Sequence, residues 1–223
     1  MIRIKTLCWL SLPKLTVLAG ALALTNFKRR IVILHEAELA SEVNILLTGI
    51  ARITCLNARS ERVTVALLAP GLISEFPTSR ISQSDFQCEA YNDCRVGCLH
   101  RNKFVGLTGK SAQSVFEDLR ENDLKQWYRR WLRSSNFLSL GLRERIAITL
   151  LGLCSEFGIK ESRGTLLRSS FSHKDIANLV GGSRPRTTEH LARLAREKLV
   201  IREGRQPVVR VASLQESIGS TPD

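Results

Sequence analysis

The sequence lacks the signatures of several common classes of protein. Its six cysteines include no Cys-x-x-Cys pair of the kind that announces a zinc site, and they are too few in 223 residues for a disulfide scaffold. We therefore expect most of them to be reduced thiols in the cytoplasm. The sequence contains no internal repeat and no low-complexity tract, and 43% hydrophobic with 24% charged residues is ordinary globular usage, which argues against disorder.

Catalytic motifs are absent as well. The sequence has no Ser/His/Asp arrangement, no paired acidic motif and no phosphate-binding loop, because Gly109-Lys110-Ser111 lacks the upstream glycine of such a loop. We therefore expect that the chain is not an enzyme.

An apolar run at residues 8–24 has two interpretations. Arg3 and Lys5 precede it and small residues end it, as in a signal peptide. Pro13 and Lys14 interrupt the run, however, and the remainder is too short to span a bilayer. We favour a buried amphipathic helix that enters the first domain, because a signal peptide conflicts with the C-terminal half, and we expect no association with a membrane.

The chain is strongly basic. Thirty-three lysines and arginines oppose 21 aspartates and glutamates, which leaves a formal net charge of +12 and a pI of about 10.0. A polyanion is therefore the expected partner, although the charge balance by itself also fits a membrane surface.

The first half of the chain has the pattern of an all-β domain. Short apolar runs alternate with polar turns about every ten residues, as in a sandwich or jelly roll. The expected strands are 30–34, 44–47, 51–56, 63–68, 86–88 and 95–99.

A long helix is expected next. Residues 111–135 contain no glycine or proline and carry apolar residues at helical spacing, which predicts a helix about 25 residues and roughly 37 Å long. Such a helix is too long for the core of one small domain, so we expect it to pack against its copy in a second chain. Packing onto its own β domain is the alternative.

The last third predicts short helices and a hairpin. Ser172 begins a helix with Asp175 at capping-box spacing, Gly181-Gly182 form a turn, and Ser183 caps a second helix with Pro185 in its first turn. The other expected elements are a helix at 140–157 ended by Gly158, a short strand at 166–167, strands at 199–202 and 208–212, and a frayed tail from Gln215.

This order is that of a helix-turn-helix with a wing. From Ser183 to Arg210 eight basic residues face three acidic ones, a net charge of +5 in 28 residues. In such motifs the N-terminal part of the second helix enters the major groove, where arginine can bind guanine O6 and N7 with two hydrogen bonds. The segment therefore predicts double-stranded DNA as a partner.

Three stretches together resemble the Crp/Fnr superfamily of bacterial regulators. Residues 172–191 resemble its helix-turn-helix, Leu47-Thr-Gly-Ile-Ala-Arg-Ile53 resembles a strand of its cyclic-nucleotide-binding jelly roll, and Leu68-Ala-Pro-Gly-Leu-Ile-Ser-Glu75 resembles the turn that follows. The resemblance covers residues 28–212. It implies an α+β fold with a β jelly-roll effector domain at 1–110, a dimerisation helix at 111–137 and a winged helix-turn-helix DNA-binding domain at 138–223.

The resemblance also implies a homodimeric transcription regulator that binds a palindromic operator and RNA polymerase. Base contacts fall on Arg184, Pro185, Arg186, Thr188 and Glu189, and phosphate contacts on Ser172, Lys174, Ser183 and Arg205. Pro185 replaces a glutamate of the family and cannot make its base contact. Glu189 stands where an arginine is usual, and it can accept from cytosine N4 or orient Arg186.

The resemblance places the effector pocket at Glu75, Arg80, Ser84 and Asp85. Glu75 fits the family's ribose contact, but Ser84-Asp85 replace the Arg-Ser pair that anchors the cyclic phosphate. We therefore expect an unknown small-molecule effector other than cyclic AMP. Arg80 as a substitute anchor remains open.

Cys88, Cys94, Cys98 and His100 form the one metal-like cluster in the sequence. Soft thiolates with an imidazole suit zinc or an iron–sulfur cluster. Buried, inert cysteines are the alternative, and no cofactor is required by the pattern. A haem, iron–sulfur or thiol-based redox or gas sensor of the same fold therefore stays open, as does an interaction module whose DNA reader does not function.

Overall fold

The computed structural model describes residues 12–35, 42–73, 87–108, 139–167, 171–203 and 206–219. The chain divides into two compact units, Met1–Arg130 and Trp131–Asp223. The predicted dimerisation helix at 111–137 lies outside the described residues, so the three predicted domain boundaries stay predictions.

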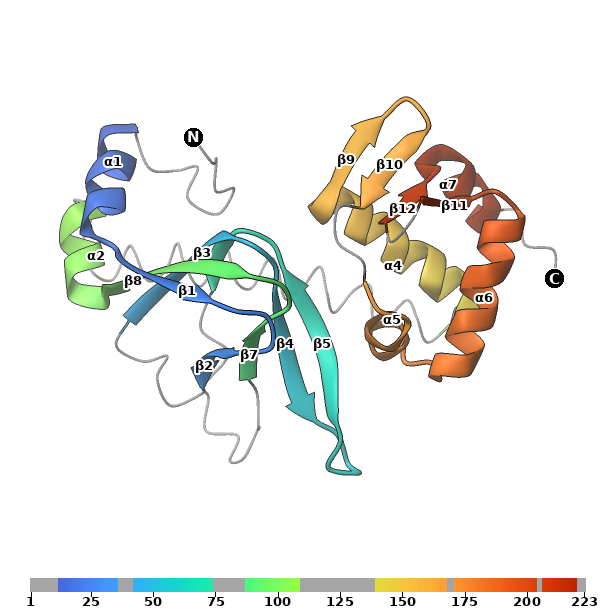
Figure 1. Cartoon of the computed structure of the whole chain (residues 1–223), viewed down its shortest axis with the longest axis horizontal. Helices are drawn as coiled ribbons and strands as arrows, with labels where there is room; N and C mark the ends of the chain where they lie inside the picture. The colour runs from blue at the N-terminus through green and yellow to red at the C-terminus, as the bar shows by residue number, and fades with distance from the viewer. Residues whose placement is uncertain are drawn as a thin grey trace. The chain divides into compact units, whose positions relative to one another are not determined.

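The N-terminal unit contains two four-stranded antiparallel sheets (Figure 1). The first has the order β1-β8-β3-β6 and the second the order β2-β7-β4-β5. The strands are β1 (Ala23–Phe27), β2 (Val32–His35), β3 (Glu42–Thr48), β4 (Ala51–Leu56), β5 (Arg62–Leu68), β6 (Gly71–Ile73), β7 (Gln87–Ala90) and β8 (Cys94–His100).

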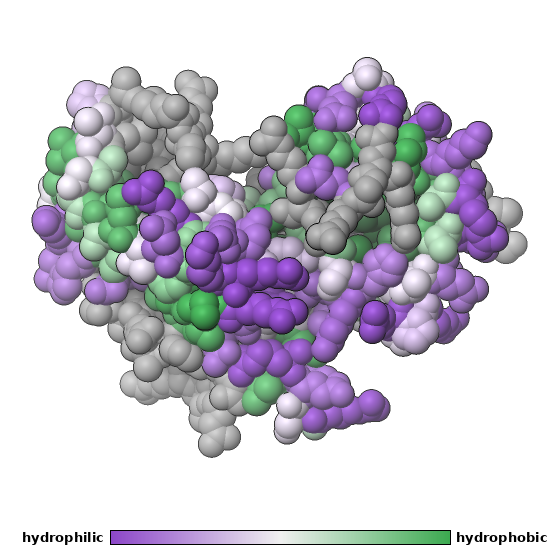
Figure 2. Space-filling view, viewed as in Figure 1, coloured by the Kyte–Doolittle hydropathy of each residue, from purple (hydrophilic) through white to green (hydrophobic). Residues whose placement is uncertain are grey.

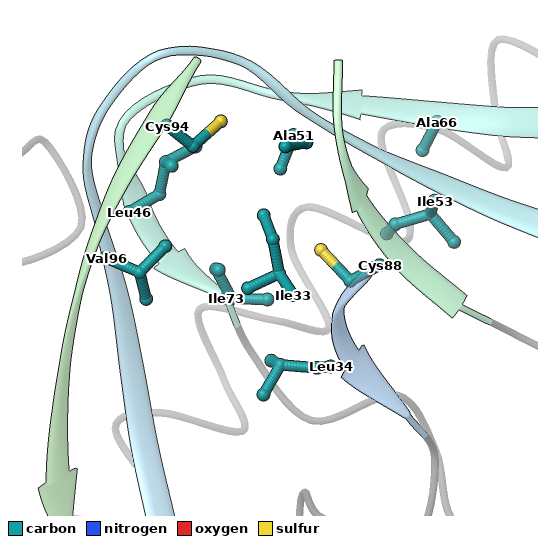
Figure 3. Close-up of a cluster of buried hydrophobic side chains, with 11 residues drawn as sticks. Ile33, Leu34, Leu46, Ala51, Ile53, Ala66, Ile73, Cys88, Cys94 and Val96 are labelled. Atoms are coloured by element: carbon teal, nitrogen blue, oxygen red, sulfur yellow. The ribbon is translucent and has the colours of Figure 1, made fainter. Parts of the chain in front are cut away.

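Apolar side chains from both sheets form one buried cluster, so the sheets pack face to face (Figure 3). Ile53 of β4, Cys88 of β7, and Leu46 and Val96 of the other sheet belong to it. The members of this inter-sheet cluster are Ile33, Leu34, Leu46, Ala51, Ile53, Ala66, Ile73, Cys88, Ala90, Cys94 and Val96. The expected β-sandwich is therefore confirmed.

Two helices cover the other face of the first sheet. Leu18 of α1 (Leu12–Ala21) and Phe104 of α2 (Arg101–Thr108) are buried together with Val43, Ile45 and Leu99 of β3 and β8. Residues 12–21 are helical, as the favoured interpretation predicts, but Leu18 is the one buried side chain among those described in α1; Ala23 and Leu24 belong to the edge strand β1, and residues 8–11 lie outside the described residues. None of the described helices is long and apolar enough to cross a membrane.

The turn between β3 and β4 requires a glycine. Gly49 has φ +93°, and a Cβ at this position would lie 2.5 Å from the carbonyl oxygen of Asp93. At the other end of β4, the hairpin to β5 is tipped by hydrophilic side chains (Figure 2). Asn57 closes it, because its Oδ1 accepts from the backbone N–H groups of Arg59 at 2.9 Å and Glu61 at 3.0 Å.

In the described part of the C-terminal unit, four helices combine with a sheet of the order β11-β12-β10-β9 (Figure 1). Its core includes Ile146, Leu167, Leu194 and Leu214, one from each of α4, β10, α6 and α7. The elements are α4 (Leu142–Phe157), β9 (Gly158–Glu161), β10 (Gly164–Leu167), α5 (His173–Leu179), α6 (Arg184–Arg196), β11 (Val200–Glu203), β12 (Gln206–Val209) and α7 (Val211–Gly219).

The prediction of a frayed tail from Gln215 is wrong. Residues 211–219 form α7, whose Leu214 is fully buried and which packs against α4. The second strand of the predicted hairpin therefore ends at Val209 rather than at Ala212.

Candidate nucleic-acid interface

The start of α5 is fixed by its own side chains. Ser172 is the N-cap, and its Oγ accepts from the backbone N–H of Asp175 at 3.1 Å. The hydroxyl of Ser172 in turn donates to the buried carboxylate of Asp175. The predicted pairing of Ser172 with Asp175 is confirmed, and the carboxylate contacts the cap hydroxyl.

The turn from α5 to α6 depends on Gly181, which adopts the left-handed φ of +61°. The next residue, Gly182, donates its N–H to the carbonyl of Ala177 at 2.9 Å. From α4, Nη1 of Arg145 donates to the carbonyl of Val180 at 3.0 Å. A side chain of α4 therefore supports the carbonyl just before the turn.

Helix α6 has one buried face and one exposed face. Thr187, Leu191 and Leu194 are buried, whereas Arg184 and Glu189 are exposed. Among the described residues that sequence analysis assigned to DNA contact, only Thr188 is half-buried. The exposed ones are Ser172, Lys174, Ser183, Arg184, Pro185, Arg186 and Glu189, and Arg205 lies outside the described residues.

An ion pair fastens the C-terminal end of α6 to α4. The guanidinium of Arg143 donates to both carboxylate oxygens of Glu197, at 2.9 and 2.7 Å, and Nε of Arg193 contacts the same carboxylate at 3.2 Å. The hydrogen bond from Arg143 holds the pKa of Glu197 below its ordinary value. Sequence analysis missed this pair, because nothing in the spacing of residues 143 and 197 indicates contact.

A second missed contact joins the two helices of the motif. Nδ1 of His173, the first residue of α5, lies 2.9 Å from Oγ1 of Thr188 in α6. After α6, the strands β11 and β12 form the wing and pair Val200 with Val209 and Ile201 with Val208. The hairpin and the two helices thus form the predicted winged helix-turn-helix.

The predicted effector residues Glu75, Arg80, Ser84 and Asp85 all lie outside the described residues. The described interior of the β-sandwich is mostly apolar, but Asn44 of β3 is buried on the inter-sheet side, because it alternates with Val43 and Ile45 of the helix-covered face, and its amide nitrogen has no hydrogen-bond partner among the described residues. Glu89 is buried, but it alternates with Cys88 and Ala90 of the inter-sheet cluster and so points to the opposite face of its sheet. There Arg52 neutralises it, with Nη2 at 2.7 Å from the carboxylate.

The structure does not assemble the predicted metal site. Cys88 and Cys94 are buried in the inter-sheet cluster (Figure 3). His100 is exposed, and Cys98 donates to the carboxylate of Glu42 at 2.8 Å. No group of three or more His, Cys, Asp or Glu side chains within the described ranges could hold a metal ion.

The thiols themselves are protonated at neutral pH. Burial raises the pKa of Cys88 to about 12 and that of Cys94 to about 11. Burial and the hydrogen bond to Glu42 raise the pKa of Cys98 to about 12. Because the thiolate is the reactive form, these environments agree with the alternative of buried, inert cysteines for Cys88 and Cys94.

Comparison with known proteins agrees with this architecture. Residues 144–216 match the family described as the Crp-like helix-turn-helix domain. No curated protein matches the chain. Solved structures do, at low sequence identity.

TTHB099, a transcriptional regulator of the CRP family from Thermus thermophilus, is 23% identical; the match covers 89% of this chain and 98% of that one, with a TM-score of 0.65. FixK2 from Bradyrhizobium japonicum is 20% identical over 87% of this chain and 96% of its own, with a TM-score of 0.69. The c-di-GMP-responsive global regulator CLP from Xanthomonas campestris is 16% identical over 90% and 99%, with a TM-score of 0.68.

A β-sandwich followed by a winged helix-turn-helix, whose second helix begins with exposed arginines, is typical of a class of DNA-binding regulators. Within that class, residues 144–216 form a Crp-like helix-turn-helix domain, and the chain has the fold of the CRP-family regulator TTHB099. The resemblance to the Crp/Fnr superfamily is thus confirmed.

Proposed function

We propose that the chain acts as a homodimer that binds a palindromic operator sequence-specifically and regulates transcription by RNA polymerase in the cytoplasm, under an effector other than cyclic AMP. The observation that carries the proposal is the exposed start of α6. Arg184 and Arg186 are exposed there, and Ser172 and Lys174 are exposed at the start of α5, which the contact between His173 and Thr188 joins to α6. Positive side chains at two neighbouring helix starts suit one groove and the phosphates that flank it.

The exposed residues of α6 then have distinct roles. Arg184 pairs with a guanine, and Pro185 contributes no donor. Glu189, one turn further along the exposed face, accepts from cytosine N4 or orients Arg186. The operator should therefore differ from those of family members that carry a glutamate and an arginine at these two positions.

Dimerisation through residues 111–137 would give two reader helices. They fit one operator only when they are about one helical turn of DNA apart, centre to centre. The effector would act by changing the orientation of the two readers, so that only one of two states binds tightly.

Two observations support an effector other than cyclic AMP. The first is that Ser84-Asp85 replace the family's phosphate anchor. The fold also accommodates different effectors: CLP is described as responsive to c-di-GMP, and CprK as complexed with OCPA.

Two arginine variants test the base contact on an operator selected from random DNA. Arg184→Ala should cost about 1–3 kcal/mol of binding free energy and relax specificity at one base pair of each half-site. Arg196→Ala, which removes the same charge from the exposed end of the same helix, should change that specificity little. Equal losses of Arg184→Ala on selected and random duplexes would contradict base reading.

The phosphate contact has a different signature. Lys174→Ala should weaken binding to every duplex similarly and lower the slope of log K against log salt concentration by about one. Fluorescence anisotropy at several salt concentrations measures both quantities. A loss confined to the selected operator would contradict the assignment.

The alternative sensors are tested by an ultraviolet–visible spectrum and metal analysis of protein purified without oxygen. A featureless spectrum without stoichiometric metal supports a small-molecule effector. A Soret band or broad iron–sulfur absorbance would overturn it and make the chain a gas or redox sensor.

A further inference from the structure

The contact between His173 and Thr188 joins the two halves of the DNA reader. Nδ1 of the imidazole lies 2.9 Å from Oγ1 of the threonine, and the two residues are 15 positions apart in the chain. His173 is the first residue of α5, whereas Thr188 lies in the second turn of α6. The bond therefore connects the helix that carries the predicted phosphate contacts with the helix that carries the predicted base contacts.

The imidazole projects from a fixed piece of backbone. Ser172 caps α5 through the N–H of Asp175 at 3.1 Å, and its carbonyl accepts from the N–H of Ile176 at 3.0 Å. Asp175 and Ile176 are buried. The position of His173 relative to α6 is thus set by the packing of α5 and not by a free helix end.

Thr188 occupies the border between the two faces of α6. Its neighbour Thr187 is fully buried and its other neighbour Glu189 is exposed, while Thr188 itself is half-buried. It follows Arg184 by four residues, so both lie on the same side of the helix. Thr188 is therefore placed beside the proposed guanine contact, with its hydroxyl within reach of His173.

A threonine hydroxyl has one donor and two acceptor sites, and its side chain can occupy more than one staggered rotamer in a helix. The bond to His173 selects one rotamer and uses one of these sites. If Nδ1 accepts, the hydroxyl presents only lone pairs to DNA and suits an adenine or cytosine amino group. If Nδ1 donates, the hydroxyl hydrogen is free for a guanine or thymine oxygen.

We propose that His173 is a positioning residue for base readout: through Nδ1 it fixes the rotamer and the remaining hydrogen-bonding site of Thr188, and so sets the base preference at one position of each half-site. The inference rests on the proposed sequence-specific DNA binding, in which Thr188 reaches a base.

The test compares base preferences of variants by selection from a randomised palindromic duplex pool. Thr188→Val keeps the shape but removes the hydroxyl, and it should lower the preference at one base pair by about 2- to 10-fold, the range of one net hydrogen bond. His173→Gln, whose amide replaces Nε2 rather than Nδ1, should lower the preference at the same base pair. His173→Asn, whose amide can stand where Nδ1 stands, should restore it.

The double variant separates positioning from a structural role. His173→Gln combined with Thr188→Val should lose no more preference than Thr188→Val alone, because the first change acts through the second residue. Unchanged preference in His173→Gln or Thr188→Val, or an equal loss of affinity for every duplex in His173→Gln, would overturn the inference while the preference set by Arg184 stands. If the unmodified protein enriches no sequence, the proposed function itself fails.

Discussion

The ion pair between α4 and the end of α6 offers a test of how the DNA-binding unit is held together. Arg143 binds both oxygens of Glu197, and the two side chains are 25% and 33% exposed. Fully exposed pairs contribute about 0.2–1 kcal/mol, and charged hydrogen bonds about 1.5–3 kcal/mol. For this partly exposed, two-bond pair we expect about 1 kcal/mol, so Glu197→Gln should raise the opening equilibrium of the unit about fivefold.

The effect should depend on pH in one direction. Because the pKa of Glu197 is lowered in the folded protein, its contribution is complete above the ordinary glutamate value of 4.5 and is lost as the pH falls through the lowered value. The difference between the wild type and Glu197→Gln should therefore be constant near neutral pH and close in acid. The guanidinium of Arg143 remains charged throughout.

Hydrogen exchange of the amides of α4, measured by mass spectrometry on the full chain, reports the opening of this unit. The matched control is Glu161→Gln, which removes an exposed carboxylate from β9. A pH-independent difference for Glu197→Gln, or an equal effect of the control, would refute the assigned role of the pair.

Three further predictions test the packing, two by thermal unfolding and one by thiol labelling. Gly49→Ala should lower the free energy of unfolding by more than about 2 kcal/mol, because φ is +93° and the new Cβ would meet the Asp93 carbonyl. The control Gly106→Ala, whose new Cβ has nothing within 4 Å, should be neutral or stabilising. Equal melting temperatures of the two variants would contradict this. Thr187→Val should stabilise by up to about 1 kcal/mol, because its buried Oγ1 has no hydrogen-bond partner among the described residues; a lower melting temperature argues against it. Cys88, buried and with a pKa of about 12, should react with iodoacetamide at pH 7.5 at least tenfold more slowly in the native than in the urea-unfolded chain, and similar rates would show that the thiol is accessible.

The sequence located most strands of the sandwich because one side of each strand is buried. Strand β4 has the predicted bounds, Ala51–Leu56, and β2, β3, β5, β7 and β8 lie within two residues of their predicted ends. β1 was missed because all but one of its five residues are exposed at the sheet edge, so that it shows no alternation. β6 has the local sequence of a turn, since it begins at Gly71 directly after Pro70.

In the C-terminal unit, local sequence signals were sufficient to predict α5 and α6 but not α7. Ser172, Gly181 and Pro185 mark helix ends by their own conformational preferences, and α5 and α6 begin where these residues predict. Helix α7 carries Val211, Leu214 and Ile218 at helical spacing, but three apolar residues were too short a pattern to predict a helix there instead of a frayed tail.

Contacts between elements could not be read from spacing. The pairs Arg143–Glu197 and His173–Thr188 form only once α4, α5 and α6 have packed. The predicted metal cluster is not assembled, again because spacing along the chain does not determine packing. Residues of equal parity share a side of a strand, but the sheet packing decides which of them are buried, and it buries Cys88 and Cys94 while leaving His100 exposed.

The central claim is sequence-specific recognition by two reader helices, and selection of the full chain on a randomised duplex pool tests it most directly. The account predicts an inverted repeat with a guanine in each half-site and half-site centres about 10–10.5 base pairs apart, with the guanine lost in Arg184→Ala. Enrichment of no sequence at low salt, or of a single unpaired site, would contradict it.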